Sequence, residues 1–126
     1  MPVKIVDASA LAALLFGEPE GAAVAKRLQD GELVAPALLA FEIANICLKK
    51  MARHSDRRDA LLEAFTIYRR MAIETVEIDH GDAIRLAEQS GLTAYDASYL
   101  WLAQQHGGEL VTLDKRLNRA AQALRQ

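Results

Sequence analysis

The feature that most constrains this fold is the alternation of short β-branched runs with longer segments of helical periodicity along the 126 residues. Such alternation is typical of βα units, whose successive strands lie parallel in one sheet. We predict strands over four short apolar runs, at residues 3–6, 33–35, 75–78 and 110–113. The sequence therefore predicts the α/β class, with a short parallel sheet of four or five strands sandwiched by about seven helices in a three-layer, Rossmann-like arrangement.

The segments between the strands have helical spacing. Pro36 is expected to open the third helix in its first turn, Asp56 to cap the fourth, and Gly91 to end the fifth. No linker or low-complexity segment interrupts the pattern, so a single domain over residues 1–126 is expected. The predicted helices cover residues 8–16, 19–29, 36–54, 56–71, 81–90, 95–106 and 115–124.

Composition describes an ordinary globular chain, with 52% hydrophobic residues, 25% charged residues and a formal charge of −2. Nothing in the bulk charge indicates a basic nucleic-acid binder, although metal binding to the acids discussed below would make the balance positive. Cys47 is the single cysteine, so a buried thiol in a reducing compartment is expected. We find no signal-peptide pattern, and the longest apolar stretch is shorter than the roughly 20 residues that span a bilayer. A cytoplasmic protein with no membrane partner is expected.

Three acidic residues follow predicted strands directly, and one of them, Asp79, is better explained as the start of a helix together with Asp82. The other two are Asp7, which comes after the first strand, and Asp114, which comes after the last one. Each can be explained as the N-cap of the next helix. Open α/β sheets, however, place ligands at the carboxyl ends of their strands. If the two strands are neighbours, the carboxylates converge and repel each other, and a shared cation would relieve that repulsion.

Two further acids lie within apolar helices. Asp96 fits a capping box with Thr93, yet the helix that it begins is apolar on nearly every side, which indicates burial. Glu42 interrupts an apolar helix far from either end and has no cation one turn away. Solvent exposure is the alternative for Glu42. Lys49 and Arg53 continue its face of the helix, which suits a metal site that borders a phosphate track.

Other motifs carry less chemistry. Asp79 and Asp82 have the spacing of a helix start, and the three His residues are scattered. The sequence contains no GxSxG, GxGxxG or Walker-type loop. Tyr99 and Trp101 are interpreted as core and interface packing.

The order of the four acids resembles that of the PIN-domain ribonucleases, and specifically the VapC-type toxins of bacterial and archaeal toxin–antitoxin pairs. The resemblance rests on IVDASALAALLFGEPEG, FEIANIC, LTAYDASYLWLA and ELVTLDKRLNRAA, which together span essentially the whole chain. It implies a PIN-like sandwich that binds Mg²⁺ or Mn²⁺ and cleaves RNA endonucleolytically by a metal-activated water. By the resemblance, Asp7, Glu42 and Asp96 match the metal-binding core, and Asp114 matches a fourth, more variable acid.

The resemblance also implies supporting residues and partners. Ser9 and Thr112 match hydroxyl positions near the metal, and Asn45 matches a helper beside Glu42. A homodimer is implied, as is a small antitoxin that covers the acid pocket. Separately from the resemblance, five basic residues near the acids are candidate contacts to RNA phosphates, namely Lys49, Arg53, Lys115, Arg116 and Arg119.

Two other classes of function are compatible with the same architecture. One is a non-catalytic α/β binding module. The other is a receiver-type phosphotransfer domain, which would have adjacent acids after its first strand and a lysine at a late strand end. This chain has Asp7 alone at the first position, and Ser9 stands where a two-aspartate phosphatase loop would need its second acid.

Overall fold

Four short strands form one parallel sheet in a computed structural model that describes residues 1–124. The strand order is β3-β2-β1-β4, so the first strand is central and pairs with the last one. Ile5 lies opposite Val34 on one side and Leu110 on the other. The predicted parallel α/β class is therefore confirmed. The strands are β1 (Val3–Val6), β2 (Glu32–Pro36), β3 (Ile73–Val76) and β4 (Glu109–Val111).

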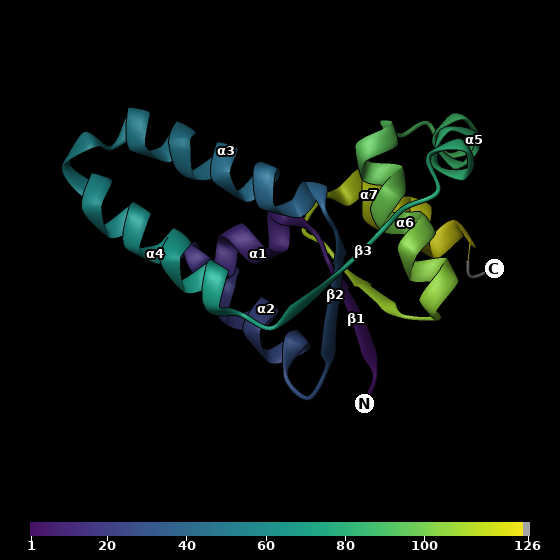
Figure 1. Cartoon of the computed structure of the whole chain (residues 1–126), viewed down its shortest axis with the longest axis horizontal. Coiled ribbons are helices and arrows are strands. Elements are labelled where there is room, and N and C mark those ends of the chain that lie inside the picture. Colours follow the sequence, from purple (N-terminus) through teal and green to yellow (C-terminus); the bar gives the residue numbers. More distant parts are fainter. Residues whose placement is uncertain (125–126) are drawn as a thin grey trace.

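Within residues 1–124, seven α-helices surround this sheet (Figure 1). The chain adds β2 and then β3 on one side of β1, and it then crosses back to add β4 on the other side of β1. Because crossovers between parallel strands are right-handed, this change of direction places the connecting helices on opposite faces of the sheet. The helices of the first face are α1 (Ala8–Leu15), α2 (Gly21–Leu28), α3 (Leu38–Arg53) and α4 (Arg58–Arg70), and those of the second are α5 (His80–Ser90) and α6 (Ala94–His106). The last helix, α7 (Lys115–Leu124), packs against α6.

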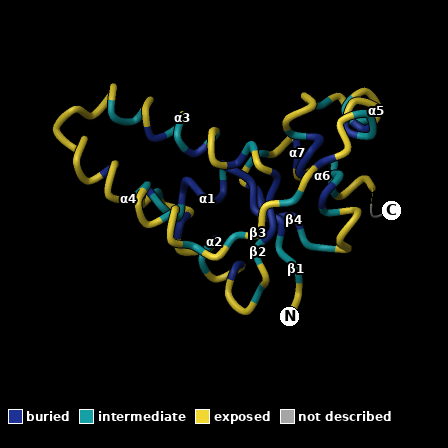
Figure 2. Tube along the Cα trace, in the orientation of Figure 1, coloured by how far each residue is buried: buried dark blue, intermediate teal, exposed yellow. Residues whose placement is uncertain are grey.

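Burial is concentrated in the sheet and in the helices next to it (Figure 2). Ile5, Val6 and Val111 are fully buried in adjacent strands. Helix α6 packs against β1, β2 and β4, and its Leu100 and Leu102 are buried as its all-round apolar pattern predicts. Helices α3 and α4 form a long hairpin that extends away from the sheet and is exposed at its tip.

Several predicted helix ends are confirmed. Helix α7 has the predicted bounds. Gly91 ends α5 with φ +67°, and Gly107 ends α6 with φ +59°, a left-handed conformation that glycine adopts without steric cost. Asp79 caps α5 by accepting the backbone N–H of Asp82 at 2.9 Å.

Three predicted helix starts are wrong. Helix α2 begins at Gly21, two residues later than expected. Pro36 is the last residue of β2 and pairs with Val76, and α3 begins at Leu38 instead. Pairing between β2 and β1 has already stopped at Val34, so a residue without an N–H is tolerated at this strand end. Asp56 does not cap α4, because it lies within a 3₁₀ turn, Ser55–Arg57, that precedes this helix.

Two predicted strands are displaced. Strand β3 lies two residues earlier than expected, and β4 ends at Val111. The apolar pattern of residues 110–113 continued beyond the last paired residue, and Thr112 instead uses its side chain in the loop. This early strand end matters for the site described below.

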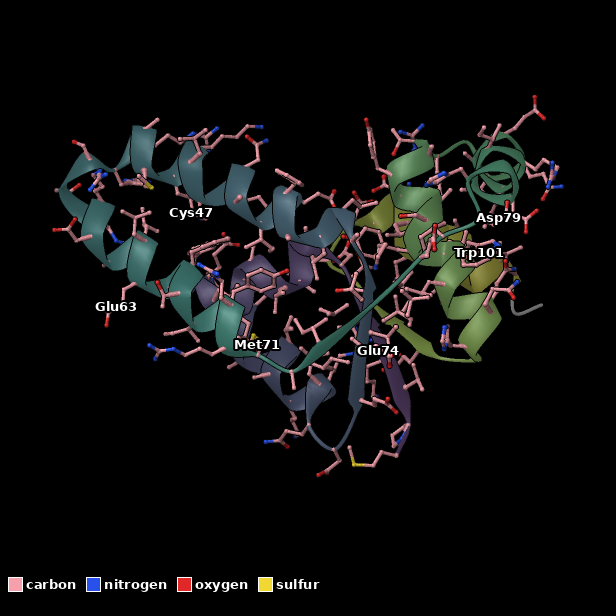
Figure 3. The ribbon with its side chains drawn as sticks, in the orientation of Figure 1. Cys47, Glu63, Met71, Glu74, Asp79 and Trp101 are labelled. Carbon is pink, nitrogen blue, oxygen red and sulfur yellow. The ribbon has the colours of Figure 1, made fainter. Side chains whose placement is uncertain are left out.

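Cys47 is buried in α3, as predicted, where Figure 3 shows it on the hairpin. Its Sγ donates to the Leu61 carbonyl oxygen at 3.5 Å, and burial raises the pKa of its thiol. No helix within residues 1–124 has the length and apolar character needed to cross a membrane.

Candidate metal centre

Asp7 lies at the carboxyl end of the central strand and is only 5% exposed. Its Oδ1 accepts the backbone N–H of Ala10 at 3.0 Å and the hydroxyl of Ser9 at 2.8 Å. Its Oδ2 accepts the hydroxyl of Thr112 at 2.5 Å. Asp7 therefore caps α1, as expected, and is also bound to the chain that leaves β4. These donors hold a buried carboxylate in one orientation.

Asp114 directly precedes α7, and its Oδ1 accepts the backbone N–H of Leu117 at 3.0 Å. Its own N–H donates to Thr112 Oγ1 at 3.0 Å, and the N–H of Leu113 donates to Ser9 Oγ at 3.0 Å. The hydroxyls of Ser9 and Thr112 lie 3.4 Å apart. These two hydroxyls thus join the ends of β1 and β4 and bring Asp114 next to Asp7.

Glu42 lies in the middle of α3 and is half-buried, so the alternative of simple solvent exposure does not hold. Its Oε1 accepts the hydroxyl of Tyr99, which comes from α6, at 2.5 Å. Burial and the charge of Glu42 raise the pKa of Tyr99 far above its ordinary value, so this hydroxyl stays protonated. The sequence did not predict this contact. The sequence signal that could have indicated it is Tyr99 itself, because the hydroxyl of a tyrosine in a buried helix needs a hydrogen-bond partner.

Asp96 lies in the first turn of α6 and is half-buried. Its backbone N–H donates to Thr93 Oγ1 at 3.1 Å, which confirms Thr93 as the helix cap. The positive charge of Arg116, on α7, lowers the pKa of Asp96, but burial and Asp114 raise it more strongly. The capping box therefore explains why an aspartate stands at position 96, but the negative charge of Asp96 is still disfavoured by burial and by Asp114.

The four acids form an electrostatic ring. Repulsion couples Asp7 to Asp114, Asp7 to Glu42, Glu42 to Asp96, and Asp96 to Asp114. Burial is the largest cause that raises the pKa of Asp7, Glu42 and Asp96, and this repulsion adds to it. Within residues 1–124, none of the four carboxylates forms an ion pair with a basic side chain. We call these residues, Asp7, Glu42, Asp96 and Asp114, the acidic ring.

The acidic ring has the chemistry of a site for a hard cation. Its donors are carboxylate oxygens from four segments, supported by hydroxyls, which is the donor set that Mg²⁺ and Mn²⁺ prefer. In the described residues, no three His, Cys, Asp or Glu side chains are already close enough to hold one ion. An ion bound by three of the carboxylates would therefore require at least one of them to move closer to the others, and it would offset the repulsion between them.

The remaining predicted residues differ in how close they lie to this ring, and Arg53 is the last residue of α3, at the far end of the hairpin. Asn45 is exposed on α3, one turn after Glu42. The candidate phosphate contacts are exposed on two separate helices, with Lys49 and Arg53 on α3 and with Lys115, Arg116 and Arg119 on α7. Among these five cations, Arg116 acts electrostatically on Asp96.

The raised pKa values predict an unusual dependence of stability on pH. A raised pKa means that the folded, metal-free protein binds protons more tightly than the unfolded chain, so stability falls as the pH rises above the ordinary aspartate value of 3.8. At pH 7, we expect metal-free Asp7→Asn to be more stable than the wild type, because it removes a buried charge. This difference should shrink by up to about 1.4 kcal/mol per pH unit as the pH falls through the raised range.

Urea unfolding in EDTA between pH 7 and pH 4 measures this difference. Asp79→Asn is the matched control, since it changes the capping residue of α5 outside the acidic ring. A constant difference between Asp7→Asn and the wild type at every pH would show that the Asp7 carboxylate is not disfavoured by folding.

Comparison with known proteins agrees with the fold. Residues 4–123 match the family described as PIN domain. The chain therefore belongs to the PIN-domain family. This match spans the sheet and all four members of the acidic ring, and it sets aside the receiver-type alternative.

A relative narrows the position within that family. The chain is 34% identical over 118 residues to Ribonuclease VapC3 from Pyrobaculum aerophilum, an alignment that covers 90% of both proteins. The resemblance to VapC-type ribonucleases is thereby confirmed. The fold is also similar to the crystal structure of PAE2754 from the same organism, with a TM-score of 0.63 and 26% identity over 98% of this chain and 92% of that one.

Proposed function

We propose that this chain is a metal-dependent endoribonuclease and the toxin of a VapBC-type toxin–antitoxin pair. The observation that carries the proposal is the acidic ring, in which four segments of a PIN-domain chain bring mutually repelling carboxylates together. The relationship to Ribonuclease VapC3 supports RNA as the substrate. PIN nucleases generally use a divalent metal ion. We propose Mg²⁺ or Mn²⁺ because the donors are all oxygens.

Each member of the acidic ring has a role in this proposal. Asp7, Glu42 and Asp96 would hold the metal ion, and Asp114 would complete the negative site. The ion would supply Lewis acidity and lower the pKa of an attacking water. Ser9 and Thr112 keep Asp7 oriented through their hydrogen bonds to its two oxygens. Asn45 is proposed as a polar helper because it follows Glu42 by one turn of α3.

The basic residues would hold the RNA backbone. Arg116 is the strongest candidate, because its charge acts on Asp96 and it therefore borders the ring. Lys115 and Arg119 extend the positive charge along α7, and Lys49 and Arg53 do so along α3. An RNA strand long enough to reach both helices would meet cations on each of them.

The proposal includes partners and a location. A small antitoxin would cover the acidic ring, and two copies of the chain would form a homodimer. The relationship to a VapC protein supports the antitoxin. We propose that residues 1–126 act as one PIN-like domain in the cytoplasm, where the buried thiol of Cys47 is compatible with reducing conditions.

An RNA cleavage assay tests the proposal directly. Purified protein with Mg²⁺ or Mn²⁺ should cut a mixed RNA substrate internally, and EDTA should stop the cleavage by removing the ion. Re-addition of the same ion should restore it. The non-catalytic alternative predicts RNA binding without cleavage in every metal, a result that would refute the nuclease function.

A further inference from the structure

Tyr99 contacts the acidic ring from the side of the core. Tyr99 is only 1% exposed. Its hydroxyl, on α6, donates to Glu42 Oε1 on α3, and the two residues are 57 positions apart in the sequence. Tyr99 lies three residues after Asp96, so the same helix supplies one member of the ring and a hydrogen bond to another. The remaining question is whether this bond only satisfies a buried hydroxyl or also orients Glu42.

Glu42 differs from the other three acids in how it is held. Asp7 and Asp114 accept backbone N–H groups at helix starts, and Asp96 lies in the first turn of α6. Glu42 lies inside α3, where the backbone N–H groups are already bonded within the helix. Tyr99 is the hydrogen-bond partner of its carboxylate within the described residues.

The need for such a partner follows from the side chain. Glutamate has three rotatable side-chain bonds and loses considerable conformational entropy when it is fixed. A hydrogen bond to a charged group is stronger than one between neutral groups, and its geometry restricts the carboxylate. Partners of this kind orient the side chains that bind metals and increase their affinity. The Tyr99 bond engages Oε1 and leaves Oε2 available.

We propose that Tyr99 is a positioning residue that orients the Glu42 carboxylate for binding a divalent cation. The inference deepens the proposed function and rests on it. Tyr99 itself is too deeply buried to meet RNA, and its role is exerted through Glu42. A purely structural hydroxyl would affect the stability of the fold and leave the affinity for metal unchanged.

The test measures Mn²⁺ binding to metal-free protein by electron paramagnetic resonance, with no RNA present. Tyr99→Phe keeps the buried ring and removes the hydroxyl, and we expect the dissociation constant for Mn²⁺ to rise roughly 10- to 100-fold. Tyr68→Phe is the matched control, since it removes the hydroxyl of a half-buried tyrosine that lies close enough to act on Tyr99 but forms no hydrogen bond to the acidic ring within the described residues. The control should bind Mn²⁺ as the wild type does. Equal affinity of Tyr99→Phe and the wild type would overturn the inference.

A double-mutant cycle identifies the path of the effect. In a Glu42→Gln background, Tyr99→Phe should produce little further loss of Mn²⁺ affinity, because its influence passes through the missing carboxylate. Independent, additive losses would overturn the inference. A wild type that binds no Mn²⁺ and cuts no RNA would instead refute the proposed function, and this inference with it.

If Tyr99→Phe does not fold, nuclear magnetic resonance on the wild-type protein tests the same inference. The Tyr99 hydroxyl proton is buried and hydrogen-bonded, so it should exchange slowly and give a resolved proton resonance in the metal-free protein. Addition of Mg²⁺ alone should shift this resonance as Glu42 engages the ion. A resonance that does not respond to saturating Mg²⁺ would overturn the inference.

Discussion

Asp7→Asn is expected to lower RNA cleavage by about 10³-fold or more while leaving the fold intact. The substitution removes a charge from the most buried member of the acidic ring. Loss of several kcal/mol of metal-dependent transition-state stabilisation corresponds to a rate loss of this size. Asparagine caps helices as well as aspartate does, so α1 should keep its bond from the Ala10 N–H. Initial rates of cleavage at saturating Mg²⁺ and far-ultraviolet circular dichroism measure the two effects.

Asp79→Asn provides the control for this experiment. Asp79 is also the capping residue of a helix, and Figure 3 shows it near Trp101, far from Cys47 on the hairpin. The same chemical change at this position should leave cleavage within about twofold of the wild type, since it is outside the acidic ring. Full cleavage by Asp7→Asn would rule out a metal role for the acid at the end of β1.

Divalent cations are expected to raise the melting temperature of the wild type by roughly 10 °C when they saturate the site. The metal-free ring contains raised carboxyl pKa values and mutual repulsion, which a bound ion would offset. An ion at about 100 times its dissociation constant stabilises the folded state by about 2.7 kcal/mol. In a domain of this size, each kcal/mol shifts the melting temperature by a few degrees. Differential scanning fluorimetry with increasing Mg²⁺ or Mn²⁺ measures the shift.

Two controls separate binding from general salt effects. NaCl at matched ionic strength should give a much smaller shift, because screening acts weakly on buried charges. Asp7→Asn should melt at a higher temperature than the wild type in EDTA and should lose most of the response to metal. An equal response of the wild type and Asp7→Asn would place the stabilising ion elsewhere on the protein.

The sequence predicted the fold class because its signals were local. Alternation of apolar runs identified the strands, and Gly91 marked the end of its helix by a local preference. The errors at Pro36 and Asp56 arose where local preferences conflict with the surrounding structure. Proline is favoured both in the first turn of a helix and at a strand end, and the sheet decided between these positions.

The acids of the candidate site could be predicted from the sequence, but the hydrogen bonds that hold them could not. Glu42 and Asp96 stood out as charges in apolar helices, which is a sequence signal. The bonds that hold the site join residues distant in sequence, such as Tyr99 with Glu42 and Thr112 with Asp7. No local pattern encodes these pairs. They depend on the pairing of β1 with β4 and on the packing of α6, which only the folded chain establishes.

The pairing of the first strand with the last has a consequence for biosynthesis. Asp7 is synthesised before the hydroxyl of Thr112 that binds it, which follows 105 residues later in the chain. A nascent chain that has not yet released β4 and Asp114 therefore has neither the support of Asp7 nor the fourth acid. Toxicity should begin only after β4 and Asp114 have been synthesised, so products truncated before β4 should be harmless to the cell that makes them.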